Sequence, residues 1–201
     1  MIRVLLAEDQ TMVRGALASL LELEPDIEVV AQVARGDAVE DAAAEARPDV
    51  ALLDIEMPGM TGLEAAEHLA KRVPECRVLI LTTFGRPGYL RRAIAGGAAG
   101  FMLKDAPATE LAGAIRRAAA GERVVDPGLA AAALSEGDSP LTARELEVLA
   151  CSRDHATVAE IASALYLSPG TVRNHLSSAM QKLGAANRAE ALRITEEKGW
   201  L

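Results

Sequence analysis

Two segments indicate the fold of this chain most clearly. They are residues 50–54, Val-Ala-Leu-Leu-Asp, and residues 77–82, Arg-Val-Leu-Ile-Leu-Thr. Each segment contains four consecutive apolar residues and ends on a polar side chain. A strand with one wet face would alternate apolar and polar residues, whereas a strand of a parallel sheet is covered by helices on both faces and reads as an unbroken apolar run. Both segments therefore predict central strands of a parallel sheet.

Three further apolar runs, at residues 2–7, 27–33 and 99–103, have the same strand-like composition. Between the five runs, apolar residues recur with helical spacing. These helical stripes lie at 12–21, 37–46, 62–72, 87–95 and 109–120. Five strand–helix units over residues 1–120 predict an α/β domain with a doubly wound, five-stranded parallel sheet, whose ligands lie at the carboxyl ends of the strands.

After residue 120 the pattern changes. Residues 121–138 are rich in Gly, Pro, Ala and acidic side chains and read as a linker that carries a short helix over 130–134. Residues 139–201 show no strand pattern and predict a second, all-α domain of four helices. Each helix begins at a polar N-cap that is followed three residues later by Glu or another polar residue. The four N-caps are Thr142, Thr157, Ser168 and Asn187.

Composition excludes several classes of protein. The 201 residues are 50% apolar and 25% charged, which is typical of two small soluble domains. The two cysteines, Cys76 and Cys151, lack partners at zinc-ligand spacing. The longest uncharged apolar stretch, 93–103, is too short to span a bilayer, and the apolar run at 2–7 is too short for a signal peptide. We therefore expect a cytoplasmic protein with no membrane partner.

Five polar residues stand at the predicted strand ends: Glu8, Asp9, Asp54, Thr82 and Lys104. The carboxyl ends of parallel strands meet at one edge, so these side chains are expected to converge. Crowded carboxylates repel one another unless a cation joins them, and a hard divalent cation prefers oxygen ligands. The plainer interpretation is that acids after strands simply begin turns and helices.

This set, with Asp54 inside Asp54-Ile-Glu-Met-Pro-Gly59, resembles the flavodoxin-like receiver domain of two-component response regulators. The resemblance implies that Asp54 accepts a phosphoryl group from a sensor histidine kinase, assisted by Thr82 and Lys104. It also implies Mg²⁺ bound by Asp9, Asp54 and the main-chain carbonyl of Glu56, with Glu8 reaching the ion through water. Phe101 occupies the position of an aromatic residue that switches together with Thr82. The alternative for Phe101 is an ordinary core residue.

Residues 140–192 resemble the LuxR-type helix-turn-helix, which together with the receiver is typical of the NarL/FixJ family. Residues 157–166 would form the positioning helix and residues 168–183 the recognition helix. Arg and Asn can read guanine and adenine in the major groove, and hydroxyls and cations near helix ends can contact phosphates. We expect base contacts from Arg173, Asn174 and Ser177, and phosphate contacts from Thr171, Lys182 and Arg188. The alternative is a solvated polar face of a packing module.

The net charge of −8 comes from residues 1–138, because residues 139–201 have equal numbers of acidic and basic residues. A neutral domain binds DNA weakly as a monomer, so we expect a homodimer that phosphorylation promotes. Residues 7–10, 81–84, 86–89 and 197–200 further resemble the DesR-like branch, which suggests control of membrane-lipid genes.

The function predicted from the sequence is therefore that of a phosphorylation-dependent transcription regulator and not of an enzyme. Two alternatives remain open at this point. One is a Mg²⁺-dependent aspartyl phosphatase that uses Asp54 as nucleophile and Glu56 as general acid. The other is an adaptor whose helical domain binds protein in place of double-stranded promoter DNA.

Overall fold

The computed structural model describes residues 1–83, 85, 87–135, 139–155 and 157–201. Phe84 and Arg86, which belong to the DesR-like segments, and linker residues 136–138 lie outside this description. The chain divides into two compact units, formed chiefly by residues 1–133 and by residues 134–201.

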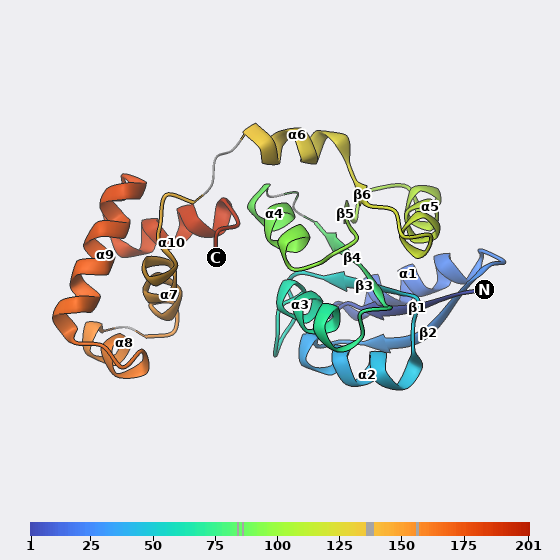
Figure 1. The fold of residues 1–201 in the computed structure, drawn as a ribbon, viewed down its shortest axis with the longest axis horizontal. Coiled ribbons are helices and arrows are strands. Elements are labelled where there is room, and N and C mark those ends of the chain that lie inside the picture. The colour runs from blue at the N-terminus through green and yellow to red at the C-terminus, as the bar shows by residue number, and fades with distance from the viewer. Residues whose placement is uncertain (84, 86, 136–138, 156) are drawn as a thin grey trace. The chain divides into compact units, whose positions relative to one another are not determined.

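The first unit is built on a parallel sheet with the strand order β2-β1-β3-β4-β5-β6 (Figure 1). Its strands are β1 (Ile2–Ala7), β2 (Ile27–Val33), β3 (Val50–Asp54), β4 (Arg77–Thr82), β5 (Gly100–Leu103) and β6 (Val124–Val125). The first five confirm the expected doubly wound sheet. The sixth was not expected, because two residues that pair with Gly100 and Phe101 are too short to produce a periodic signal.

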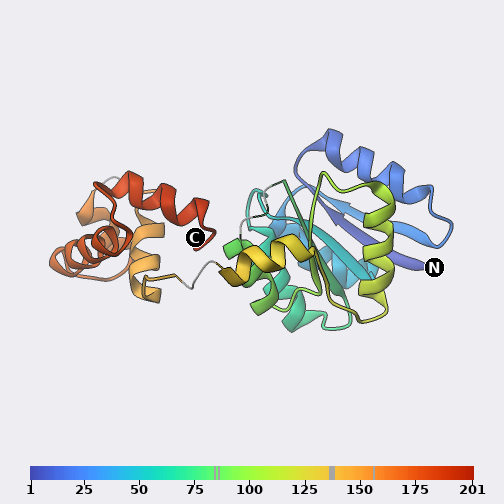
Figure 2. The same ribbon diagram turned by 90° about the horizontal axis from the view of Figure 1, so that it is seen from above.

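Helices cover both faces of this sheet. Helices α1 (Thr11–Glu22) and α5 (Ala108–Ala119) pack on one face, against alternate strand residues such as Leu6, Leu52 and Leu79. The other face is covered by η1 (Gly36–Ala38), α2 (Val39–Ala46), α3 (Gly62–Arg72) and α4 (Pro87–Ala95). There, the intervening strand residues, such as Leu5 and Leu53, are buried. Figure 2 shows the strands running between the two groups of helices. Burial on both faces is the reason that β3 and β4 read as unbroken apolar runs.

The second unit consists of α7 (Ala143–Cys151), α8 (Val158–Ala164), α9 (Pro169–Leu183) and α10 (Arg188–Glu197). All four predicted N-caps are confirmed, because the side chains of Thr142, Thr157, Ser168 and Asn187 each accept a hydrogen bond from the backbone N–H three residues on. The helices enclose a small apolar core that includes Val148, Leu149, Ile161, Val172 and Ala179.

Two element boundaries differ from those expected. The helix within the linker, α6, covers Pro127–Ser135 and so begins earlier than residue 130. Helix α8 stops at Ala164 and does not reach Tyr166, whose φ of 54° is incompatible with a right-handed helix. In the part of the chain that the structure describes, no helix combines the length and the hydropathy needed to cross a membrane.

Candidate functional site

The sheet brings the five predicted site residues to one edge. Asp54 ends β3 and Thr82 ends β4, while Glu8 and Asp9 follow β1 and Lys104 follows β5. Because β1, β3, β4 and β5 are consecutive neighbours in the sheet, their carboxyl ends lie side by side. A cavity of about 130 Å³ opens between them, lined by Asp9, Gln10, Asp54, Glu56, Thr82 and Thr83.

Lys104 is the centre of the polar contacts at this edge. Its Nζ lies 2.6 Å from Oε2 of Glu8 and 3.0 Å from Oδ1 of Asp54. The Lys104 side chain is 11% exposed and that of Glu8 only 1%, so water screens these ion pairs poorly. The backbone N–H of Ile55 also donates to Oδ1 of Asp54, at 2.8 Å. One cation thus faces two buried carboxylates, and Asp9 adds a third, exposed one.

The surroundings raise the pKa of both partners of the ion pair between Lys104 and Asp54. Burial is the largest influence on Asp54 and raises its pKa, while the hydrogen bond and charge of Lys104 only partly offset this effect. Burial by itself would lower the pKa of the Lys104 ammonium. Its bonds to Glu8 and Asp54 outweigh that effect, so the pKa of Lys104 lies above its ordinary value. Lys104 is therefore a permanent positive charge beside the Asp54 carboxylate.

The donor set fits a hard divalent cation. Glu8, Asp9 and Asp54 each offer a carboxylate oxygen, and these three oxygens lie within 4.8 Å of one another. Oxygen ligands, more than one carboxylate and an opening to solvent are what Mg²⁺ uses in proteins. Glu56, the other predicted ligand residue, is exposed and lines the same cavity. The geometry therefore brings the predicted metal ligands together.

Phe101, the predicted switch aromatic, is completely buried among the apolar residues beneath α2, α3 and α4. It lies on β5, whose end is tied to β4 because the Lys104 N–H donates to the Thr82 carbonyl oxygen at 2.9 Å. In this structure, Phe101 is a core residue next to the strand that carries Thr82.

A contact between α6 and the loop after Thr82 was not predictable from the sequence pattern. Leu129 of α6 packs against the apolar cluster that contains Phe101, and its Cδ2 would lie 2.3 Å from a Cβ placed on Gly85. Leu103 borders the same position. The absence of a Cβ at residue 85 lets the Leu129 side chain lie close to the loop. The sequence signal for this contact is Leu129 itself, which directly precedes the alanines at 130–133.

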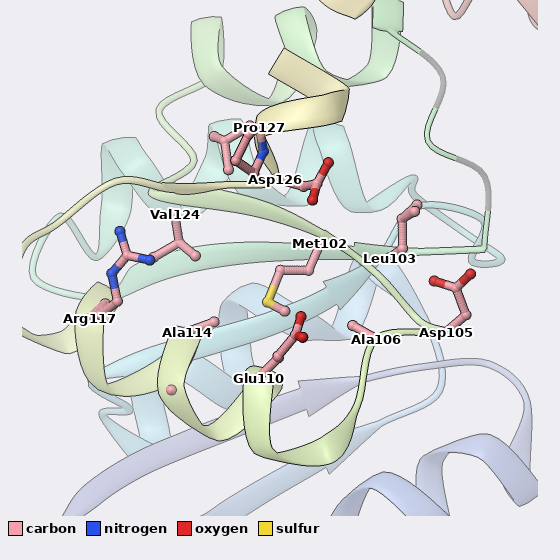
Figure 3. Close-up of a pocket in the computed structure, with 12 residues that line it drawn as sticks. Met102, Leu103, Asp105, Ala106, Glu110, Ala114, Arg117, Val124, Asp126 and Pro127 are labelled. Carbon is pink, nitrogen blue, oxygen red and sulfur yellow. The ribbon is translucent and has the colours of Figure 1, made fainter. Parts of the chain in front are cut away.

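A second, larger cavity of about 490 Å³ lies between α5, β5 and β6, and contains none of the predicted site residues. Figure 3 shows the carboxylates of Asp105, Glu110 and Asp126 around the side chain of Met102. Arg117, on the rim, pairs with Glu122 at 2.8 Å.

Helix α9 presents the predicted base-reading residues to solvent. Val172, Leu176 and Ala179 are buried in the core. Arg173, Asn174 and Ser177 are exposed. Ser168 caps the helix, and its hydroxyl oxygen lies 2.8 Å from that of Thr171. Burial of one face of α9 therefore determines which of its side chains are exposed on the opposite face.

Lys182 and Arg188, two of the residues predicted to contact phosphates, are bonded to other residues of the same domain. Nζ of Lys182 lies 2.7 Å from Oε2 of Glu145, and Ser178 donates a hydrogen bond of 2.6 Å to the other carboxylate oxygen. The Lys182 ammonium, followed by the Ser178 hydroxyl and the Thr142 N–H, lowers the pKa of Glu145 to about 2. Arg188 donates to the carbonyl oxygen of His155 at 3.3 Å.

Comparison with known proteins assigns both units. Residues 4–116 match the response regulator receiver domain, and residues 139–195 match the luxR family of bacterial regulatory proteins. The chain is 49% identical to the transcriptional regulatory protein DesR of Bacillus subtilis, covering 100% of this chain and 99% of DesR. It is 48% identical to the uncharacterized transcriptional regulatory protein YvfU of the same organism, over the full length of both chains.

Among solved structures, the response regulator ChrA of a heme-sensing two-component system matches over 100% of this chain and 98% of its own. The two share 33% identity with a TM-score of 0.59. DesR and YvfU are both named as transcriptional regulatory proteins, and in this chain the receiver match precedes the luxR-family match. The chain therefore belongs to the two-component response regulators that join a receiver domain to a LuxR-type DNA-binding domain.

Proposed function

We propose that this regulator is switched by phosphorylation of Asp54, and that the phosphorylated protein dimerises and binds promoter DNA in a sequence-specific manner. Residues 1–120 would act as the phosphoacceptor domain, 121–138 as the linker and 139–201 as the DNA-binding domain. The observation that carries the proposal is the placement of Lys104, whose ammonium contacts the Asp54 carboxylate at the edge where three carboxylates gather.

The contacts of Asp54 suggest which atom reacts. Lys104 and the Ile55 N–H both bind Oδ1, so we assign Oδ2 as the nucleophile. It attacks the phosphorus of a phosphohistidine on the sensor kinase, the P–N bond breaks, and a P–O bond to Asp54 forms. The Lys104 ammonium then pairs with a negatively charged phosphoryl oxygen, and the Thr82 hydroxyl donates a hydrogen bond to another phosphoryl oxygen.

Asp9, Asp54 and the Glu56 carbonyl would hold Mg²⁺, with Glu8 contacting it through water. When bound, the ion neutralises phosphoryl charge that would otherwise repel the carboxylates. Glu8 positions Lys104 in the structure, because its buried carboxylate contacts the ammonium at 2.6 Å.

Phosphorylation can be tested by intact mass spectrometry with acetyl phosphate and Mg²⁺. We expect wild type and Asp41→Asn, which removes an exposed carboxylate on α2, to gain one phosphoryl group. Asp54→Asn and wild type with EDTA should gain none. Phosphorylation of Asp54→Asn would exclude this acceptor. Repeated turnover of small phosphate esters by wild type would favour the aspartyl phosphatase instead.

Light scattering on the same samples tests dimerisation, with a monomer-to-dimer shift expected only where Asp54 is phosphorylated.

Selection of bound duplexes from a random pool then tests DNA recognition. Enrichment of a motif with two half-sites is expected, because a two-fold dimer reads two copies of its site. Failure to retain any duplex at low salt would favour the protein-binding adaptor. The resemblance of residues 7–10 and 197–200 to the DesR-like branch extends the proposal to promoters of membrane-lipid genes, which an enriched motif upstream of such genes would support.

A further inference from the structure

Tyr166 lies in the turn between α8 and α9 and combines two unfavourable features. Its backbone is left-handed, with a φ of 54°, and 96% of the residue is exposed. A left-handed conformation is strained for a residue with a bulky side chain. An aromatic ring in water recovers none of that strain through burial.

The turn requires the backbone conformation but not the tyrosine side chain. The Tyr166 N–H donates to the Ser163 carbonyl oxygen at 3.4 Å, and the Leu167 N–H donates to that of Ala162 at 2.8 Å. Leu167 then packs against the core and Ser168 caps α9. This is the helix-ending arrangement in which glycine is the usual residue.

Several other helices follow that usual choice. Left-handed glycines stand just after α4, α5, α9 and α10, at Gly97, Gly121, Gly184 and Gly199. Among the residues that the structure describes, Arg47 after α2 and Tyr166 are the non-glycine residues with positive φ. Tyr166 is 96% exposed, so its side chain buries almost no surface against the described part of its domain.

We propose that Tyr166 contacts the DNA backbone, with its phenol hydroxyl donating a hydrogen bond to a phosphate at the rim of the major groove. Tyr166 precedes Pro169, the first residue of α9, by three positions. The N-terminal part of a recognition helix is the part that enters the groove, which brings the preceding turn to the phosphates. Tyrosine is among the side chains that make such contacts.

The charge of the domain supports this assignment. Residues 139–201 carry no net positive charge, and two of their cations, Lys182 and Arg188, are bonded to the Glu145 carboxylate and to the His155 carbonyl oxygen. A neutral donor on the exposed turn would add a phosphate contact without adding charge to the domain. The inference rests on the proposed DNA binding.

The test uses the full-length protein with Mg²⁺ and beryllofluoride, and measures anisotropy of a fluorescent mixed-sequence duplex over a salt series. Tyr166→Phe removes only the hydroxyl. We expect it to weaken binding by about tenfold, the scale of a hydrogen bond to a charged group. The slope of affinity against salt should not change, because a neutral side chain releases no counterions.

Tyr166→Gly and the matched control Arg47→Gly separate binding from strain. Both should raise Tm, because each replaces a strained left-handed residue by glycine. Only Tyr166→Gly should weaken DNA binding, whereas Arg47→Gly should bind as wild type does.

Two results would overturn the inference. If Tyr166→Phe binds as tightly as wild type while Arg173→Ala binds less, Tyr166 makes no backbone contact but the proposed DNA binding stands. If wild type binds no duplex at low salt, the proposed DNA binding fails and this inference fails with it.

Discussion

The ammonium of Lys182 lies 2.7 Å from a carboxylate oxygen of Glu145, so an ion pair ties the recognition helix α9 to the first turn of α7. Glu145 is only 5% exposed and also receives hydrogen bonds from Ser178 and from its own N-cap, Thr142. The carboxylate thus fixes the orientation of α9 as well as the start of α7. Lys182, expected at a phosphate, is exposed and paired with Glu145.

Replacing Lys182 by Met removes the charged partner of this buried carboxylate. We expect the free energy of unfolding of the C-terminal domain to fall by about 1–3 kcal/mol, since the carboxylate keeps only its neutral donors. Urea unfolding followed by circular dichroism measures the change. Gln181→Met, at the exposed neighbouring position of α9, is the matched control and should change stability little. Equal stability of the two variants would contradict a structural role for the ion pair.

The pH dependence of stability follows from the pKa of Glu145, which is about 2 in the folded protein against an ordinary 4.5. A depressed folded pKa gives stability that is fully present above pH ~4.5 and is lost as pH falls toward 2. Glu145→Gln cannot ionise and should be less stable than wild type by roughly 1–3 kcal/mol at pH 6. The difference between the two proteins should shrink steadily between pH 5 and pH 2.5. A constant difference over this range would mean that charge contributes nothing at residue 145.

Lys104→Met should slow phosphorylation of Asp54 by about 100-fold or more, because a buried cation aimed at developing phosphoryl charge is lost. The rate of phosphoryl gain from acetyl phosphate, measured at saturating Mg²⁺, checks this. Lys71→Met, an exposed lysine near the end of α3, should react at the wild-type rate. Far-ultraviolet circular dichroism will show whether Lys104→Met keeps its fold. A folded variant with the wild-type rate would remove Lys104 from the mechanism.

Leu129→Ala should loosen α6 from the receiver domain, because Leu129 is the side chain that packs over Gly85 and Leu103. We expect proteolysis within residues 127–135 to become several-fold faster, and the receiver domain to lose about 1–2 kcal/mol of stability. Leu23→Ala, which truncates a largely exposed leucine, should change neither value. Unchanged cleavage in Leu129→Ala would show that this leucine does not hold the helix.

The strands and helices of both domains were predictable because their signals are local. The apolar runs at 50–53 and 78–81 are unbroken since both of their faces are buried, and the N-caps at 142, 157, 168 and 187 satisfy donors only three residues away. The convergence of Glu8, Asp9, Asp54, Thr82 and Lys104 was also predictable, because parallel strands place their carboxyl ends at one edge.

Contacts between distant residues were decided by tertiary structure alone. Lys182 meets Glu145 because α7 and α9 pack together, and Leu129 meets Gly85 because α6 folds back over β5. The two-residue strand β6 exists because β5 offers it an edge to pair with. The left-handed turn at Tyr166 likewise depends on Leu167 reaching the core. Local sequence therefore determined five of the strands, the N-caps of the C-terminal helices and the polar residues at the strand ends, because those signals lie within a few residues. Packing decided which charges are paired and which side chains remain exposed.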